Sequence, residues 1–427
     1  MESRSFTWKG WEKGSITELK EHSKAKLDIL RDYIQDYLEI IIGHSTGGSE
    51  TTFYFIDGFA GGGQYDGGEL GSPFVFLQAI KETEFKLNQN RNKKIKIKYK
   101  LFCIEKDKNH FDALNFTFES SEYKSELQKN VFLCKGTFTN NIPSIIQIIK
   151  KNHPRGGGNT FLFLDQCGYA KVPVDILKGI SVDLNNKVEF LINFNVYSFI
   201  TYMEDGKLTN KRIENLGLEN YVDPKVITHN KMNEGKFWRH NVEKIIGNAL
   251  KSAIGLDYFS PFYIFTTKHN QQGYWLIHIA CHERARSAMM DVYWKYGTNM
   301  RHFGSNGLNI FERRYSDNES NYIEGLDFVE TNKIDTIEKI KEDLIHNKFA
   351  KGVFKPRSVQ DLYSEICNNT IANREILGKA LQGLYEERFI EITGKSGGRK
   401  RSNQVKPEHI IHINQPSLFE YKDFYNH

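Results

Sequence analysis

The stretch that decides the fold is Phe53–Phe76, with the sequence FYFIDGFAGGGQYDGGELGSPFVF. Its first apolar residues, up to Asp57, predict a buried strand. A glycine-rich loop follows, and Gly-Ser-Pro then precedes a second apolar run that predicts a helix beginning at Pro73. Strand, glycine loop and helix in this order predict the first unit of a doubly wound α/β domain.

The same alternation of strands and helices continues along the chain. Further strands are predicted within YKLFCIEKD, NVFLCKGTF, TFLFLDQCGYAKVP and KVEFLINFNVYS, with helical segments between them. Because these strands are mostly solid apolar runs, they predict a parallel sheet covered on both faces. A helix is predicted over 15–43, a helical insertion over about 200–260, and two strands joined by a turn within FYIFTTKHNQQGYWLIHIA. The sequence therefore predicts a Rossmann-like sheet with a helical insertion.

The C-terminal part has a different pattern. Three amphipathic helices are predicted in DTIEKIKEDLIHN, SVQDLYSEICNN and ANREILGKALQGLYEERF, and two short strands follow in IEITGKSGGRKRSNQVKPEHIIHI. Three helices and then a hairpin are typical of a winged-helix domain. The predicted organisation is an N-terminal helical segment over 1–50, a Rossmann-like domain over 51–330 and a winged-helix domain over 331–427.

Composition argues against several classes of protein. The chain has 427 residues, a formal net charge of +5 and five cysteines without a CxxC pair, which argues against a disulfide framework or a zinc site. His278 and His282 stand four apart, but no third ligand is suggested, so no metal is predicted. No signal peptide or membrane span is recognisable, and a cytoplasmic protein without membrane contact is expected.

The glycine loop lacks one feature of a dinucleotide site. A Gln-Tyr pair stands where the third glycine of G-x-G-x-x-G is needed. The pattern D-x-F-x-G-x-G is closer to the loop of Rossmann-like methyltransferases, in which the acid faces the amino group of S-adenosylmethionine. S-adenosylmethionine is therefore the predicted cofactor. Its predicted binding residues in this loop are Asp57, Gly58, Phe59, Gly61 and Gly63.

Two further strand ends supply candidate cofactor contacts. Glu105 ends LFCIE, where a carboxylate can accept both ribose hydroxyls; Asp107 is a weaker rival for this role. The third strand ends without the acid that many methyltransferases place near adenine, so Thr137 or backbone groups are predicted there.

The end of the fourth strand is the predicted chemical position. Asp165 is expected to face the transferable methyl group and to accept a hydrogen bond from a target amine, because ligands bind beyond the carboxyl ends of the strands. Gln166 is predicted to hydrogen-bond a base edge, and Tyr169 to stack on the base. Cys167 could instead be a covalent nucleophile, although a small buried residue is the favoured interpretation.

These motifs together resemble a known family. The segments FYFIDGFAGGGQYDGGELGSP, FCIEKD, FLFLDQCGYAKVP, FLINF and FYIFTTKHNQQGYWLI are similar to the three-Cys-motif partner family, over about residues 15–310. The resemblance implies a class I methyltransferase-like core, S-adenosylmethionine binding at Asp57, Gly61, Gly63 and Glu105, and a radical-S-adenosylmethionine-like partner with a three-cysteine motif. In the family the fourth-strand motif usually reads Asp-Pro-aromatic-Gly, whereas this chain has Asp-Gln-Cys-Gly.

The tip of the predicted wing is basic and suits nucleic acid. Four cations without an intervening acid are predicted to reach phosphates of DNA or RNA, namely Lys395, Arg399, Lys400 and Arg401. A protein-binding winged helix with a solvated tip is the alternative interpretation.

Two functions follow from this reasoning. One is an S-adenosylmethionine-dependent methyltransferase acting on nucleic acid, in phage defence or nucleic-acid modification. The other is a methyltransferase-like protein without transfer activity that binds nucleic acid or a partner protein.

Overall fold

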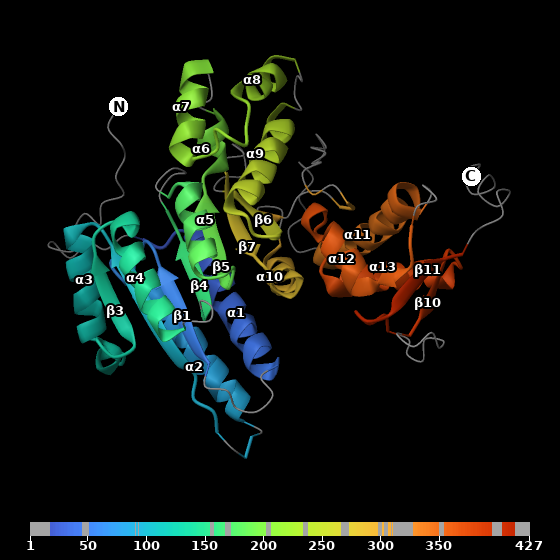
Figure 1. Ribbon diagram of the computed structural model, residues 1–427. Coiled ribbons are helices and arrows are strands. Elements are labelled where there is room, and N and C mark those ends of the chain that lie inside the picture. The colour runs from blue at the N-terminus through green and yellow to red at the C-terminus, as the bar shows by residue number, and fades with distance from the viewer. Residues whose placement is uncertain are drawn as a thin grey trace. The chain divides into compact units, whose positions relative to one another are not determined.

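The computed structural model describes residues 18–44, 51–89, 91–92, 94–153, 158–166, 172–201, 206–233, 238–265, 273–297, 301–302, 306–308, 310, 328–349, 354–394 and 404–414. Contacts within the chain divide it into two compact units (Figure 1). The first comprises Met1–Tyr296 with Met300–His302, and the second comprises Gly297–Asn299 with Phe303–His427.

The first unit is built on one eight-stranded sheet. Its strands are β1 (Thr52–Asp57), β2 (Lys98–Glu105), β3 (Val131–Lys135), β4 (Asn159–Leu164), β5 (Val188–Phe194), β6 (Tyr258–Phe265), β7 (Gly273–Ala280) and β8 (Arg301–His302). The spatial order is β3-β2-β1-β4-β5-β7-β6-β8. Strands β1 to β5 pair in parallel, and β7 lies antiparallel between β5 and β6. This confirms the predicted Rossmann-like sheet of the class I methyltransferase type.

Helices cover both faces of this sheet (Figure 1). They are α1 (Glu21–His44), α2 (Ser72–Asn88), α3 (Lys108–Glu119), α4 (Phe138–Asn152), α5 (Val174–Asp183), α6 (Val196–Thr201), α7 (Gly206–Leu216), α8 (Pro224–Asn233), α9 (Trp238–Ile254) and α10 (Glu283–Tyr296). Helix α1 packs against α2 and α10, while α5 packs against α4 and α9. Helices α6 to α9 form the predicted insertion between β5 and β6. The sequence did not predict α10.

The core of the first unit is largely aromatic. Phe53 and Phe55 on β1 stack, with ring centroids 6.4 Å apart, and Tyr37 of α1 packs edge-on against both. Phe161 of β4 lies 5.9 Å from the same tyrosine ring. These side chains are almost completely buried. Together they form an apolar layer between α1 and the sheet, and its burial stabilises the unit.

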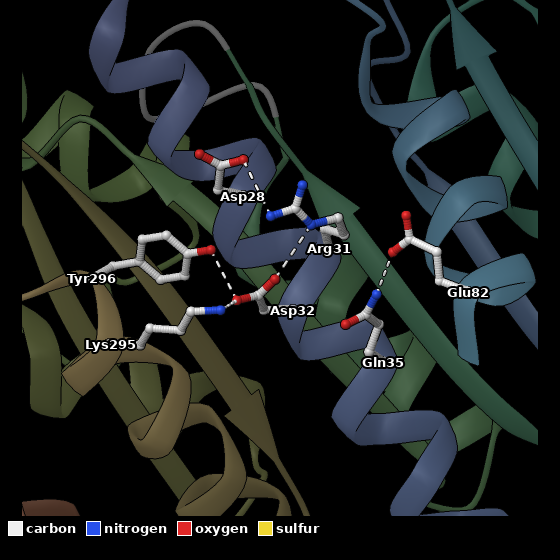
Figure 2. Close-up of polar contacts among 7 residues, drawn as sticks. All are labelled: Asp28, Arg31, Asp32, Gln35, Glu82, Lys295 and Tyr296. Atoms are coloured by element: carbon white, nitrogen blue, oxygen red, sulfur yellow. Dashed lines mark hydrogen bonds and ion pairs between the residues drawn. The ribbon is translucent and has the colours of Figure 1, made fainter. Parts of the chain in front are cut away.

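Polar contacts fix α1 to its two neighbouring helices (Figure 2). Asp32 of α1 pairs with Lys295 of α10 and accepts a hydrogen bond of 2.9 Å from the hydroxyl of Tyr296. On another side, the Gln35 amide donates to Glu82 of α2 at 2.5 Å. Helix α1 is thus an integral layer of the unit, although its first turn begins at Glu21, later than the predicted start at residue 15.

A buried polar cluster attaches α1 to the sheet as well. Tyr33 donates its hydroxyl hydrogen to Glu189 at the start of β5, and His278 of β7 lies 3.0 Å from the same carboxylate oxygen. Burial raises the pKa of Tyr33 well above its ordinary value, and the neighbouring Glu189 carboxylate adds to this. The tyrosine is therefore a neutral donor that positions the helix.

The second unit is a winged helix. Its elements are α11 (Phe328–Leu344), a π-helical turn (Ile345–Phe349), β9 (Arg357–Ser358), α12 (Val359–Ile366), α13 (Arg374–Glu386), β10 (Ile390–Thr393) and β11 (Ile410–Ile413). The predicted hairpin is present as the antiparallel pair β10–β11, and β9 adds a third strand to it. Asn373 caps α13 by accepting a hydrogen bond from the Ile376 backbone N–H.

Candidate cofactor site

Acidic and polar side chains of the first unit meet at the carboxyl edge of its parallel strands. Asp57 ends β1 and is paired in register with Cys103 of β2 and Phe163 of β4. Glu105 and Asp165 each follow those partners by two residues, so these two acids lie at one level, roughly 7 Å beyond Asp57 along the strand direction. In a doubly wound sheet this edge is where ligands bind.

Asp57 is the most unusual group at this edge. It is completely buried, and its Oδ1 accepts a hydrogen bond of 3.2 Å from the Phe59 backbone N–H. Its Oδ2 has no hydrogen-bond partner of good geometry among the described residues. Burial raises the pKa of Asp57 to about 7; the Ser72 hydroxyl and the Phe59 amide favour the charged form, whereas Asp165 and Glu105 oppose it. A buried acid with one unsatisfied oxygen points to a function other than stability.

The glycines give the loop after β1 its path. Gly61 and Gly63 have φ angles of 62° and 82°, which side-chain-bearing residues rarely adopt. A Cβ atom on Gly63 would lie 2.9 Å from Leu114 of α3, and one on Gly58 would lie 2.5 Å from Leu164 of β4. Gly58 and Gly63 are therefore needed because a side chain at either position would clash within the protein. The loop that contains them begins at the carboxyl end of β1, directly after Asp57.

The structure distinguishes the two acids near the end of β2. Glu105 accepts hydrogen bonds from the backbone N–H groups of Gly61 (2.9 Å) and Asp107 (2.7 Å), so it links the glycine loop to β2. Asp107 caps α3 by accepting from the N–H groups of Asn109 and His110. Because this capping role occupies Asp107, Glu105 is the better candidate for a ribose contact.

Thr137 also acts as a helix cap. Its hydroxyl accepts a hydrogen bond of 3.2 Å from the Asn140 N–H at the start of α4 and lies 3.0 Å from the Thr139 hydroxyl. A contact between Thr137 and adenine would have to share this hydroxyl. The backbone of the preceding Gly136 is the other candidate for an adenine contact. Its φ of 129° is a conformation that glycine adopts readily and other residues rarely adopt.

Asp165 has two partners that sequence reasoning missed. The Lys26 ammonium, from α1, lies 2.6 and 2.8 Å from its two oxygens, and the Asn193 amide at the end of β5 donates to Oδ1 at 2.7 Å. Lys26 is only 6% exposed. Its position in the sequence carried a signal, because it stands on the stripe that continues through Ile29, Leu30 and Tyr33. A lysine on the apolar stripe of a helix calls for a buried partner.

The residues after Asp165 differ in how far the structure describes them. Gln166 is 3% exposed and lines a small cavity with apolar side chains of α5, α9, β5 and β7, among them Val174, Leu177 and Leu250. Cys167 and Tyr169 lie outside the described residues, so the predicted stacking role stays a prediction. Asp165 therefore lies at the carboxyl edge of the sheet, whereas the Gln166 side chain points into the apolar side chains that line this cavity.

The other predicted sites are as follows. Lys395, Arg399, Lys400 and Arg401 fall outside the described part of the winged helix. Within the described ranges, no cluster of histidine, cysteine and acidic residues could hold a metal ion. None of the described helices has the length and apolarity to span a membrane.

Comparisons with known proteins add one domain assignment. Residues 314–397 match the family model of a GMT-like wHTH domain, which agrees with the winged helix of the second unit. No curated protein matches the sequence.

The solved structures that are similar to the chain include the following two. One is protein LPL1258 from Legionella pneumophila str. Philadelphia 1, of the DUF519 family, at 11% identity and a TM-score of 0.30 over 59% of this chain and 84% of that one. Another is the plantazolicin methyltransferase BamL in complex with a triazolic desmethylPZN analog and SAH, at 10% identity and a TM-score of 0.25 over 61% and 86%. At these scores neither likeness bears on function, and neither tests the resemblance to the three-Cys-motif partner family.

Proposed function

We propose that the first unit binds S-adenosylmethionine at the carboxyl edge of its sheet and that the chain is a methyltransferase acting on nucleic acid. The observation that carries the proposal is Asp57, a fully buried acid whose Oδ2 has no hydrogen bond of good geometry among the described residues. A positively charged ligand group at this oxygen would provide the missing partner.

The residues present fit this cofactor. S-adenosylmethionine has a cationic amino group and a cationic sulfonium, and the edge presents the acids Asp57 and Glu105, while Asp165 beside them is paired with Lys26. Each oxygen of Glu105 accepts one backbone hydrogen bond, and a carboxylate oxygen can accept two. Glu105 therefore retains capacity for both ribose hydroxyls while it holds the glycine loop. When bound, the cofactor would supply the transferable methyl group.

Calorimetry of the full chain with S-adenosylmethionine tests the cofactor. We expect binding by the wild type and a loss of about 10- to 100-fold in affinity for Asp57→Asn, because a charge-assisted hydrogen bond contributes about 1.5–3 kcal/mol. Asp66→Asn, which alters an exposed acid of the same loop, is the matched control and should bind like the wild type. Absence of binding by the wild type would refute the proposal.

The pH dependence of binding gives a second measurement. With a pKa of about 7, Asp57 is mostly neutral at pH 6 and mostly charged at pH 7.5. Since the cationic amino group favours the charged acid, affinity should fall about fivefold from pH 7.5 to pH 6. The Asp57→Asn variant should lack most of this dependence.

The winged helix is the proposed nucleic-acid module. On α13, Glu375 pairs with Lys379 at 2.7 Å and Gln382 donates to Glu386 at 2.5 Å, so this surface of the helix carries little net positive charge. Phosphate contacts are therefore assigned to the basic wing tip rather than to α13. Fluorescence anisotropy with labelled DNA and RNA of equal length would compare the two nucleic acids.

A partner protein and a role in phage defence are the least constrained parts of the proposal. They rest on the sequence resemblance to the three-Cys-motif partner family. Co-expression with a three-cysteine-motif protein encoded beside this chain, followed by size-exclusion chromatography, tests the partner; separate elution of the two proteins would argue against it.

One observation favours the alternative of a binding protein without transfer activity. In Asp-Pro-Pro methyltransferases a proline follows the acid. Here the residue after Asp165 is Gln166, and its side chain is buried among Val174 and Leu177. Transfer of labelled methyl groups to nucleic acid separates the two functions. A protein that binds S-adenosylmethionine but transfers nothing to DNA or RNA would support the alternative.

A further inference from the structure

The Lys26–Asp165 ion pair changes the charge at the position proposed for methyl transfer. Lys26 contacts both carboxylate oxygens, at 2.6 and 2.8 Å, and its side chain is only 7% exposed. The acid and the ammonium together have no net charge. A substrate that approaches Asp165 therefore meets a neutral pair rather than a free carboxylate.

Lys26 is fixed in this place by the way α1 is held. Asp32 and Gln35, six and nine residues further along the helix, bind α10 and α2 (Figure 2). Tyr33 binds Glu189 in the sheet. The ring of Tyr274, near the start of β7, lies 5.9 Å from the Lys26 ammonium and favours a cation there. The ammonium is therefore a permanent part of the site.

The hydrogen bonds around Asp165 leave one acceptor for a ligand. Oδ1 already accepts from both Lys26 and Asn193, whereas Oδ2 accepts only from Lys26 among the described residues. Since a carboxylate oxygen accepts two hydrogen bonds, Oδ2 can take one more. Asn193 is 5% exposed, and its own Oδ1 has no partner within the described part of the chain. This amide oxygen has essentially no exposed surface and is closed to a ligand, so Asn193 acts through the N–H that it donates to Asp165.

We propose that Lys26 and Asn193 are positioning residues that make this site selective for an uncharged amine, such as the exocyclic amine of a nucleobase. One N–H of that amine would be donated to Asp165 Oδ2. An alkylammonium, such as a protein lysine side chain, is disfavoured because Lys26 repels it and already neutralises the acid. The inference rests on the proposed function and specifies its substrate class.

The reaction balances with these groups. The nitrogen of the uncharged amine forms a bond to the methyl carbon while the carbon–sulfur bond breaks and its electron pair stays on sulfur. S-adenosylhomocysteine leaves, and the methylated nitrogen releases one proton through Asp165 Oδ2 to water. No oxidant, reductant or further reactant is needed.

A first experiment tests the charge arrangement without cofactor. Lys26→Ala retains Cβ, so n-propylammonium supplies the missing atoms. We expect propylammonium chloride to raise the melting temperature of Lys26→Ala above the effect of equal sodium chloride, and to do so in neither the wild type nor Lys26→Ala/Asp165→Asn. Equal effects in all three proteins would overturn the proposed arrangement.

A second experiment tests substrate selectivity with labelled methyl transfer. The wild type should methylate a mixed-sequence single-stranded oligonucleotide and not a lysine-rich peptide. Lys26→Met should reduce transfer to the oligonucleotide by about 100-fold with cofactor affinity changed less than about threefold, and Lys26→Arg should restore at least a tenth of the wild-type rate. Preference of the wild type for the peptide, or full transfer by Lys26→Met, would overturn the inference.

The two experiments separate failure of the inference from failure of the proposed function. No cofactor binding by the wild type refutes the proposed function and removes the basis of the inference. Cofactor binding without transfer to either substrate refutes only the methyltransferase activity, and the propylammonium result then decides whether Lys26 sets the charge of the site.

Discussion

Replacing Asp57 by asparagine should increase the stability of the first unit while it weakens cofactor binding. Burial raises the pKa of Asp57 from the ordinary 3.8 to about 7. A carboxyl group whose pKa is raised by folding stabilises the folded state below its unfolded pKa, and that contribution is lost as the pH rises through the folded value. The wild type should therefore lose stability between pH 4 and pH 7.

The magnitude follows from the pKa difference. The change from 3.8 to about 7 corresponds to about 4 kcal/mol of destabilisation at pH 8, since each pKa unit is worth about 1.36 kcal/mol. The asparagine amide leaves an N–H at the position of Oδ2 without a described partner, which costs about 1–3 kcal/mol. The net gain of the variant at pH 8 is therefore about 1–3 kcal/mol.

Urea unfolding between pH 4.5 and pH 8 measures this effect. All five tryptophans precede residue 297, so their fluorescence reports on the first unit. The difference in unfolding free energy between Asp57→Asn and the wild type should grow by about 2–3 kcal/mol from pH 4.5 to pH 6.5. Asp66→Asn serves as the control for removal of one acid. A difference that does not change with pH would refute the reasoning about Asp57.

Three further predictions concern local structure and nucleic-acid binding. Gly63→Ala should destabilise the first unit by about 1–3 kcal/mol, because its φ is 82° and the added Cβ would lie 2.9 Å from Leu114. Gly43→Ala, which has no atom within 4 Å of the added Cβ, should not destabilise it; equal losses in urea unfolding would contradict this. Asn373→Ala should destabilise α13 by about 1 kcal/mol through loss of its cap, as seen by hydrogen exchange, and unchanged protection would argue against the cap. Replacing three cations of the wing by alanine should weaken DNA or RNA binding and reduce the salt slope by about 2–3, and an unchanged slope would remove the wing from the interface. These cations are Arg399, Lys400 and Arg401.

The fold could be predicted largely from the sequence because its signals are local. Solid apolar strands such as Phe53–Ile56 separated by helical segments determine a parallel sheet, and Pro73 marks the first turn of α2. The wing hairpin was likewise visible as two apolar runs, whereas β9 is only two residues long and forms through pairing with β11. Such a short strand has no periodicity that a sequence could reveal.

The candidate site was only partly predictable because its polar contacts join distant elements. Asp57, Glu105 and Asp165 could be placed at one edge, since strand ends in a parallel sheet converge. The Lys26–Asp165 pair spans 139 positions and depends on how α1 packs. Glu105 also binds the Gly61 amide, 44 positions away, which no spacing in the sequence indicates.

A crystal structure of the full chain with S-adenosylhomocysteine tests the central claim most directly. We expect the ligand at the carboxyl edge of β1 and β2, with its amino nitrogen within hydrogen-bond distance of Asp57 Oδ2 and its ribose hydroxyls on Glu105. A ligand bound elsewhere, or in a pose that leaves Asp57 Oδ2 without a partner, would contradict it.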